Sequence, residues 1–376
     1  MKLAGLLLAA ALAWLAAWPA HAHKPSDSYL SLKVDGGRIS GQWDIALRDL
    51  DFALGLDADG DGRITWGEVR AQHAAIAAHA LARLAVQADG SACTVTAGEQ
   101  LVDRHTDGAY TVIPLQVSCP QPPTTLGLTY RLFAEVDPLH RGLLRLETQG
   151  QTRTAVLGPH APSQQFGLAA PGGRLEQFLA YGREGVWHIW IGYDHILFLL
   201  SLLLPAVLVR RDDGWGAAAR FRDGFIDVLK IVTSFTVAHS ITLTLATLGV
   251  VSLPSRWIES AIAASVVLAA LNNVVPLFQG RRWTVAFAFG LIHGFGFASV
   301  LADLGLPQSA LVLALVGFNL GVELGQIAIV SAFLPLAYAL RGTWFYRRAV
   351  FVGGSVAIAI VAAAWLVERA FDLQVM

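Results

Sequence analysis

The chain has 376 residues, of which 55% are hydrophobic and 15% charged, with a formal net charge of −1. This composition is far more apolar than that of an average soluble protein, and it makes a membrane protein the first expectation. A net charge near zero and a sequence without a basic tract argue against nucleic acid as a partner.

The first 22 residues have the form of a secretory signal peptide. Lys2 precedes an apolar run over residues 3–18, and Ala20 and Ala22 supply the small residues of a cleavage site. The rest of the chain is therefore expected to start outside the cytoplasm, in the periplasm of a bacterium.

Residues 23–157 are expected to form a β-rich periplasmic domain. Apolar and polar residues alternate along several short runs, and the turn at residues 35–38 joins two of them as a hairpin. One alanine-rich helix is predicted from Trp66 to Leu84, which gives a β-sandwich-like domain with one inserted helix. In an oxidising compartment Cys93 and Cys119 are expected to form a disulfide.

A twelve-residue segment, Asp57–Glu68, matches the calcium-binding loop of an EF-hand. The donors at loop positions 1, 3, 5, 7, 9 and 12 are Asp57, Asp59, Asp61, Arg63 (through its backbone carbonyl), Thr65 and Glu68. Residues 47–56, which precede the loop, are expected to be extended. We therefore expect a structural Ca²⁺ that stabilises this domain; the alternative is a surface turn without an ion.

Residues 158–183 are rich in proline and glycine and are expected to form a linker. Beyond them, residues 184–370 contain apolar stretches long enough to cross a hydrocarbon core of roughly 30 Å. There are six, at about 186–209, 229–251, 257–278, 283–302, 309–338 and 349–368. The arginines and lysines gather in alternate loops, which predicts a six-helix transmembrane bundle in the inner membrane with the N-terminal domain in the periplasm.

Among the few ionisable side chains within or beside these stretches, where each costs roughly 2.5–3.5 kcal/mol on insertion scales, six are candidates for chemistry. They are His188, Asp194, His195, His239, His293 and Glu323. Most of them fall near the bilayer midplane when residues are counted from the expected outer helix ends. We therefore expect them to form a metal site there. The alternative is that each histidine only hydrogen-bonds between helices.

The spacing within this set assigns individual roles. His188 and His195 are seven residues apart, which on one continuous helix puts both imidazoles on the same face about 10 Å apart. His188 is then a ligand at the entrance, near the interface. Asp194 is expected either to orient His195 or to bind the metal, and Glu323 to act as a ligand or balance charge. Imidazole and carboxylate without thiolate favour Ni²⁺, Co²⁺ or Zn²⁺ over Cu⁺.

Four segments around these residues resemble motifs of HupE/UreJ-type membrane proteins. They are His188-x5-Asp194-His195 with residues 196–200, Phe235–Leu243 around His239, Phe289–Ala298 around His293, and Phe318–Gln326 around Glu323. The segment that begins at His23 resembles the longer members, which carry a β-domain before the membrane part. The resemblance implies a nickel or cobalt permease, as in members associated with hydrogenase and urease maturation.

We therefore expect a carrier of a divalent transition metal, not an enzyme, whose partners are the lipid bilayer and metal ions. Two other functions stay open. In one, the protein is a membrane-anchored metal sensor or a scaffold for metalloenzyme maturation, and the bundle serves only as an anchor. In the other, the same cluster activates water in an intramembrane metal-dependent hydrolase.

Overall fold

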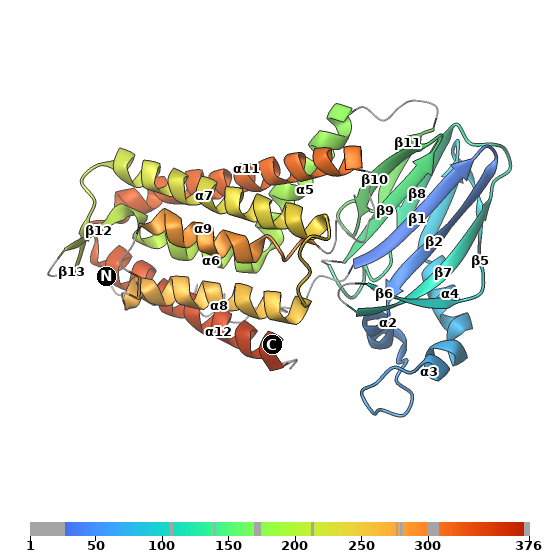
Figure 1. Cartoon of the computed structure of the whole chain (residues 1–376), viewed down its shortest axis with the longest axis horizontal. Coiled ribbons are helices and arrows are strands. Elements are labelled where there is room, and N and C mark those ends of the chain that lie inside the picture. The colour runs from blue at the N-terminus through green and yellow to red at the C-terminus, as the bar shows by residue number, and fades with distance from the viewer. Residues whose placement is uncertain are drawn as a thin grey trace, which may run out of the picture.

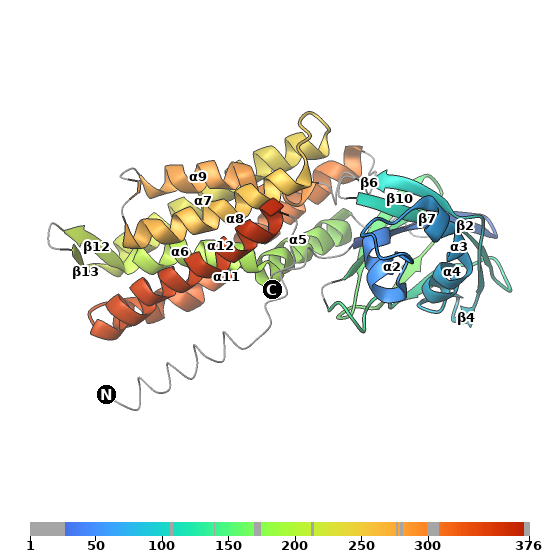
Figure 2. The same cartoon turned by 90° about the horizontal axis from the view of Figure 1, so that it is seen from below.

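The computed structural model describes residues 27–371 except 106–107, 139, 169–173, 212–213, 276, 279–280 and 299–307. The predicted signal peptide lies outside the described residues. Two parts follow one another along the chain, a β-rich part and a helical part (Figure 1). The β-rich part sits against one end of the helices, and the short β12–β13 hairpin lies at the other end (Figures 1 and 2).

The β-rich part contains two sheets. The larger has the order β10-β9-β1-β2-β7-β5, with β6 also paired to β7, and all its pairs are antiparallel except β1 with β9. Its strands are β1 (Asp27–Asp35), β2 (Arg38–Ala46), β5 (Thr94–Ala97), β6 (Leu101–His105), β7 (Gly108–Ser118), β9 (Arg141–Thr148) and β10 (Gln151–Leu157). The smaller sheet has the order β11-β8-β3-β4, formed by β3 (Leu84–Ala88), β4 (Ser91–Ala92), β8 (Thr125–Tyr130) and β11 (Ser163–Gly167).

Alternating side chains of both sheets form the domain core, as the sequence pattern predicts. Trp43 is fully buried there, and its indole N–H donates to Ser28 Oγ at 3.1 Å. Ser28 Oγ also contacts the hydroxyl of Tyr130, which in turn meets Nε2 of His140. Burial lowers the pKa of His140 to about 3, so this imidazole stays neutral at physiological pH. The predicted disulfide between Cys93 and Cys119 is present.

Three local expectations for the β-rich part are wrong. Residues 47–54 form helix α2 (Leu47–Leu54) instead of an extended segment, because Leu47 and Leu50 bury one face and Gly55 ends the helix in the left-handed region, at φ 66°. The helix predicted over 66–84 is two helices, α3 (Trp66–Ala71) and α4 (His73–Leu81), and strand β3 begins at Leu84.

The third concerns the predicted linker. Residues 163–167 form strand β11, which pairs with β8 and buries Phe166 in the core. The next helix begins at Arg174, within the range expected to be a linker. The glycine and proline residues that suggested a linker flank these elements instead of replacing them.

Among its described residues, the helical part contains four helices that are long and apolar enough to cross a membrane, or up to five spans if a bent pair counts as one. Its elements are α5 (Arg174–Ile191), α6 (Tyr193–Leu203), the turn η1 (Leu204–Val207), β12 (Leu208–Arg211), β13 (Gly214–Ala217), α7 (Phe221–Thr247), α8 (Ser255–Val274), α9 (Arg282–His293), α11 (Gln308–Leu340), η2 (Phe345–Gly353) and α12 (Gly354–Phe371). The bent pair, α5 with α6, occupies the first predicted stretch. Helix α9 ends after twelve residues, so the six-span bundle stays a prediction.

Glycines set how closely these helices approach. A Cβ at Gly321 of α11 would lie 1.9 Å from the backbone oxygen of Gly182 on α5. A Cβ at Gly294, which follows α9, would lie 2.4 Å from the backbone oxygen of His239 on α7. Both distances are shorter than any van der Waals contact, so the backbones come together only because side chains are absent. This close packing brings the helices that carry the histidines together.

Candidate metal site

The first apolar stretch is broken at Gly192, and the break brings two histidines together. The chain bends by 72° between α5 and α6, within residues 177–207, and Gly192 has an extended conformation at the bend. His188 ends up on one side of the break and His195 on the other, with ring centroids 4.6 Å apart. The expected separation of about 10 Å on one continuous helix is therefore wrong.

Three imidazoles from three helices form the centre of the site. Ligand nitrogens of His188 on α5, His195 on α6 and His239 on α7 all lie within 4.8 Å of one another. In each ring Nε2 is buried and has no hydrogen-bond partner. A buried nitrogen without a partner is costly. Three imidazoles grouped within this distance, each with such an atom, are an arrangement that a metal ion would satisfy.

The second nitrogen of His195 is held by a carboxylate. His195 Nδ1 donates to Asp194 Oδ1 at 3.0 Å, and the same oxygen accepts from the backbone N–H of His195 at 2.9 Å. Asp194 Oδ2 faces Arg369 of α12 at 3.9 Å. Asp194 lies in the first turn of α6, where a carboxylate is favoured by the helix dipole. Of the two predicted roles of Asp194, this geometry corresponds to orienting His195.

His239 has an equivalent partner in Asn319 of α11. The amide nitrogen of Asn319 donates to the backbone oxygen of Leu315 at 2.8 Å, which turns Oδ1 toward His239 Nδ1 at 3.2 Å. An amide oxygen only accepts, so Nδ1 of His239 carries the proton. The lone pair of this ring is therefore on Nε2, as in His195, and a lone pair is what a metal ion requires.

His293 provides a fourth nitrogen beside this group. The hydroxyl of Ser265 donates to the backbone oxygen of Ile262 at 2.7 Å and accepts from His293 Nε2 at 2.9 Å. The lone pair of His293 is then on Nδ1, which is buried and without a partner. Its ring centroid lies 5.2 Å from that of His195. His293 is thus next to the three-histidine group rather than part of it.

Glu323 is not brought into the histidine group. Its carboxylate accepts a hydrogen bond from Thr233 of α7 at 2.7 Å. On α11 it follows Asn319 by four residues, which is one helical turn or about 6 Å along the axis. The predicted role of Glu323 as a ligand or charge balance is therefore at odds with its position, and Asn319 occupies the place next to His239.

Aromatic rings enclose the histidines on two sides. Phe297 and Phe318 are stacked with centroids 4.4 Å apart, and both contact His188, at 4.9 and 5.3 Å. On another side Phe198 and Phe235 contact His293, at 4.9 and 5.3 Å. All four phenylalanines are buried. These rings shield His188 and His293 from water on two sides, while the ring of His188 stays partly exposed.

Sequence reasoning missed three residues that shape this site, namely Gly192, Ser265 and Arg369. Gly192 had a readable signal, because a glycine at the N-cap followed by an acidic residue in the first turn, here Asp194, is typical of the start of a new helix. Ser265 and Arg369 lie on α8 and α12, far from the histidines in sequence, and no local pattern marks them.

The acidic loop is a second candidate site, and helices flank it on both sides. Carboxylate oxygens of Asp57, Asp59 and Asp61 lie within 4.8 Å of one another. Asp57 accepts backbone hydrogen bonds from Gly60 and Gly62, at 2.8 Å each. Hydrogen bonds from Thr65 lower the pKa of Glu68, which keeps that carboxylate ionised.

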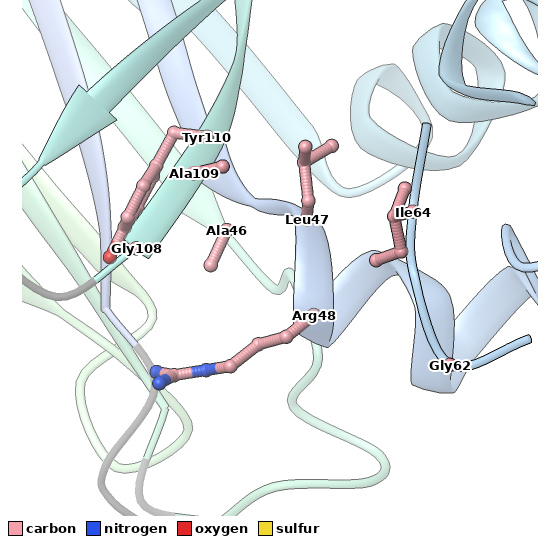
Figure 3. A pocket seen from close by; sticks show the side chains of 8 residues that line it. All are labelled: Ala46, Leu47, Arg48, Gly62, Ile64, Gly108, Ala109 and Tyr110. Carbon is pink, nitrogen blue, oxygen red and sulfur yellow. The ribbon is translucent and has the colours of Figure 1, made fainter. Parts of the chain in front are cut away.

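Beside this loop lies a cavity of about 220 Å³ (Figure 3). It is bounded by the loop at Gly62 and Ile64, by the start of α2, and by Tyr110 of β7. Arg48 extends along one side of it (Figure 3). None of the residues that line this cavity belongs to the histidine group, so it is separate from the candidate transition-metal site.

Several apolar helices, with a cluster of three histidines that could hold a metal ion, indicate a multi-pass membrane protein. The family model described as HupE / UreJ protein matches residues 164–369, which is more than half of the chain. The chain therefore belongs to the HupE/UreJ family, a transporter-type family linked to nickel/cobalt transport or urease maturation. No curated protein matches the chain.

Proposed function

We propose that the protein carries Ni²⁺ or Co²⁺ across the inner membrane of a bacterium, with its β-rich domain in the periplasm. The observation that supports this most is the set of buried imidazole nitrogens without partners, on His188, His195, His239 and His293. Hydrogen bonds to Asp194, Asn319 and Ser265 leave the lone pair of three of these rings on the unpartnered nitrogen. Neutral imidazoles of this kind suit borderline divalent ions such as nickel and cobalt.

In this proposal the three-histidine group binds the ion first, and His293 takes part when the ion moves on. The described site offers neutral nitrogen donors alone, and Asp194 contacts His195 instead of the ion. The ligands therefore do not neutralise the charge of the ion. A carrier needs a site that binds and then releases its ion, which is a reason to use neutral ligands instead of thiolates.

The test is the metal content of cells that express the protein. We expect cells with the wild-type chain to differ from control cells in nickel or cobalt, measured by mass spectrometry beside zinc, copper and manganese. The variant H195A/H293A, at matched expression, is expected to abolish the difference. If wild-type and variant cells have the same content of every metal, the carrier proposal is wrong and the maturation scaffold takes its place.

We also propose that the loop Asp57–Glu68 binds Ca²⁺ and stabilises the β-rich domain. The spacing of its donors supports this, together with α2 and α3 on either side of the loop. Asp51 of α2 accepts a hydrogen bond from the backbone N–H of Asp57 at 2.8 Å, so the loop is tied to the helix that precedes it.

Calcium is expected to raise the unfolding temperature of the domain in the full-length protein. A ligand at 100 times its Kd stabilises the folded state by about 2.7 kcal/mol, which corresponds to a shift of several degrees. The substitution E68Q should remove the shift, and D35N, at the exposed end of β1, should retain it. Scanning fluorimetry with calcium and with a chelator makes the comparison. An unchanged wild-type unfolding temperature would refute the calcium site.

A further inference from the structure

Within the described residues the histidine site is largely enclosed: His195, His239 and His293 are buried, and His188 is partly exposed. The four unpartnered nitrogens have essentially no solvent-accessible surface. A metal ion reaches them only when part of the surrounding structure moves. Two pairs of phenylalanines cover the site, Phe198 with Phe235 and Phe297 with Phe318, and different parts of the protein pack behind each pair.

Behind Phe198 and Phe235 lies the large apolar core of the helical part. Both rings belong to one buried cluster that extends through α6, α7, α8, α9, α11 and α12. Opening on that side requires several packed helices to separate. The other layer consists of the stacked pair Phe297 and Phe318. These rings belong to a smaller cluster, which contains side chains of α5, α7 and α11 and also of the β-rich domain.

The β-rich domain contributes both apolar side chains and a charge to this contact. Tyr29, Tyr110 and Leu143 are at most 5% exposed and share one cluster with Phe297 and Phe318. The guanidinium of Arg141 on β9 lies over the ring of Phe297, 5.6 Å from its centroid. Arg141 thus contacts Phe297, and Phe297 and Phe318 in turn contact His188.

Arg141 is held firmly in this position. Its Nε and Nη2 donate to the two oxygens of Asp27 on β1, at 2.8 and 2.9 Å, which is a bidentate pair. Asp27 neutralises the guanidinium, and the carboxylate of Glu184 lies nearby, so the contact blocks an ion through packing and not through charge. The contact therefore excludes ions for as long as the β-rich domain stays packed against Phe297.

We propose that the β-rich domain is the outer gate of the histidine site, and that Arg141 and Phe297 form its closing contact. This inference rests on the proposed function for the position of the site and for the side from which the ion comes. The domain joins the helices through a non-covalent contact and a short connection before α5, so it can shift while the helices stay packed. Lifting Arg141 from Phe297 frees that ring to leave its partner Phe318, which uncovers His188.

The gate can be tested without any metal, through the reaction of histidines with diethyl pyrocarbonate. The full-length protein is treated with the reagent, and mass spectrometry follows the modification of each histidine over time. Opening of the gate controls how often His188 becomes reactive. We expect His188 to react at least about tenfold faster in R141A and in F297A than in the wild type.

Three internal controls make the result specific. R145A changes the same residue type on the same strand, where Arg145 is paired with Glu147, and it should leave the rate at His188 unchanged. His73, on α4 of the β-rich domain, should react at the same rate in every variant. His140, buried in the core of the β-rich domain, reports unfolding, and it should stay unreactive.

The outcomes separate the gate from the proposed function. Faster reaction of His188 in both variants, with His140 still protected, supports the gate. An unchanged modification rate of His188 in F297A overturns the gate, and so does an equal increase of that rate in R145A. Both results decide the question even if R141A fails to fold and exposes His140. Because the assay uses no metal, a protein that opens in this way but does not change cellular nickel or cobalt would refute the carrier and leave the gate standing.

Discussion

Purified protein with alanine in place of His195 is expected to bind Ni²⁺ at least about 100-fold more weakly than the wild type, since loss of even an outer-shell partner costs 10–100-fold. His195 is at the centre of the site, with its ring next to those of His188 and His293. Its loss removes one of three converging nitrogens and leaves Asp194 without its imidazole partner. Isothermal titration in detergent measures the change.

The same measurement should show little effect for E323Q, within about threefold of the wild type, because an outlying polar group contributes little to a site it does not touch. The amide retains an oxygen that accepts from Thr233, so helix packing is preserved. H160A, which removes an exposed histidine of the β-rich domain, controls for binding outside the site. Strong loss of affinity in E323Q with normal affinity in H195A would contradict the site described above.

The identity of the site residues was largely predictable from the sequence, because ionisable groups in apolar stretches are rare and stand out. His188, His195, His239 and His293 were all found in this way. Their grouping was less predictable. Counting residues along helices gives depth in a membrane, and it put Glu323 and His239 at similar depths. It does not fix the axial stagger of two helices to within one turn, and in the structure Asn319 lies beside His239 while Glu323, one turn further along α11, faces Thr233.

In the β-rich part, too, local sequence patterns predict some elements and miss others. Strands such as β7 and β9 follow from alternating residues, and they were expected within a few positions. Helix α2 was missed because its eight residues are too few for a clear helical period, and its apolar residues continue the pattern of the preceding strand. The contact of Arg141 with Phe297 joins residues far apart in the chain, and nothing local to either residue indicates it.

Alanine at Gly192 is expected to weaken Ni²⁺ binding by about 10- to 100-fold, the range for loss of a group that orients a ligand. A Cβ at this position would lie 2.7 Å from the backbone oxygen of His188 and 2.8 Å from Nδ1 of His195. The methyl group therefore forces the break to widen or the ring of His195 to turn away from Asp194. Either change separates the nitrogens that the break brings together.

G342A is the matched control, because a Cβ at Gly342 meets nothing within 4 Å, and it should bind Ni²⁺ as the wild type does. A double-mutant cycle with D194A then tests the mechanism. If Gly192 acts by keeping His195 on Asp194, the two substitutions remove the same interaction, and together they should cost little more than the stronger one alone. Fully additive losses would mean that Gly192 acts elsewhere. The break between α5 and α6 would then be a feature of packing, separate from the orientation of His195.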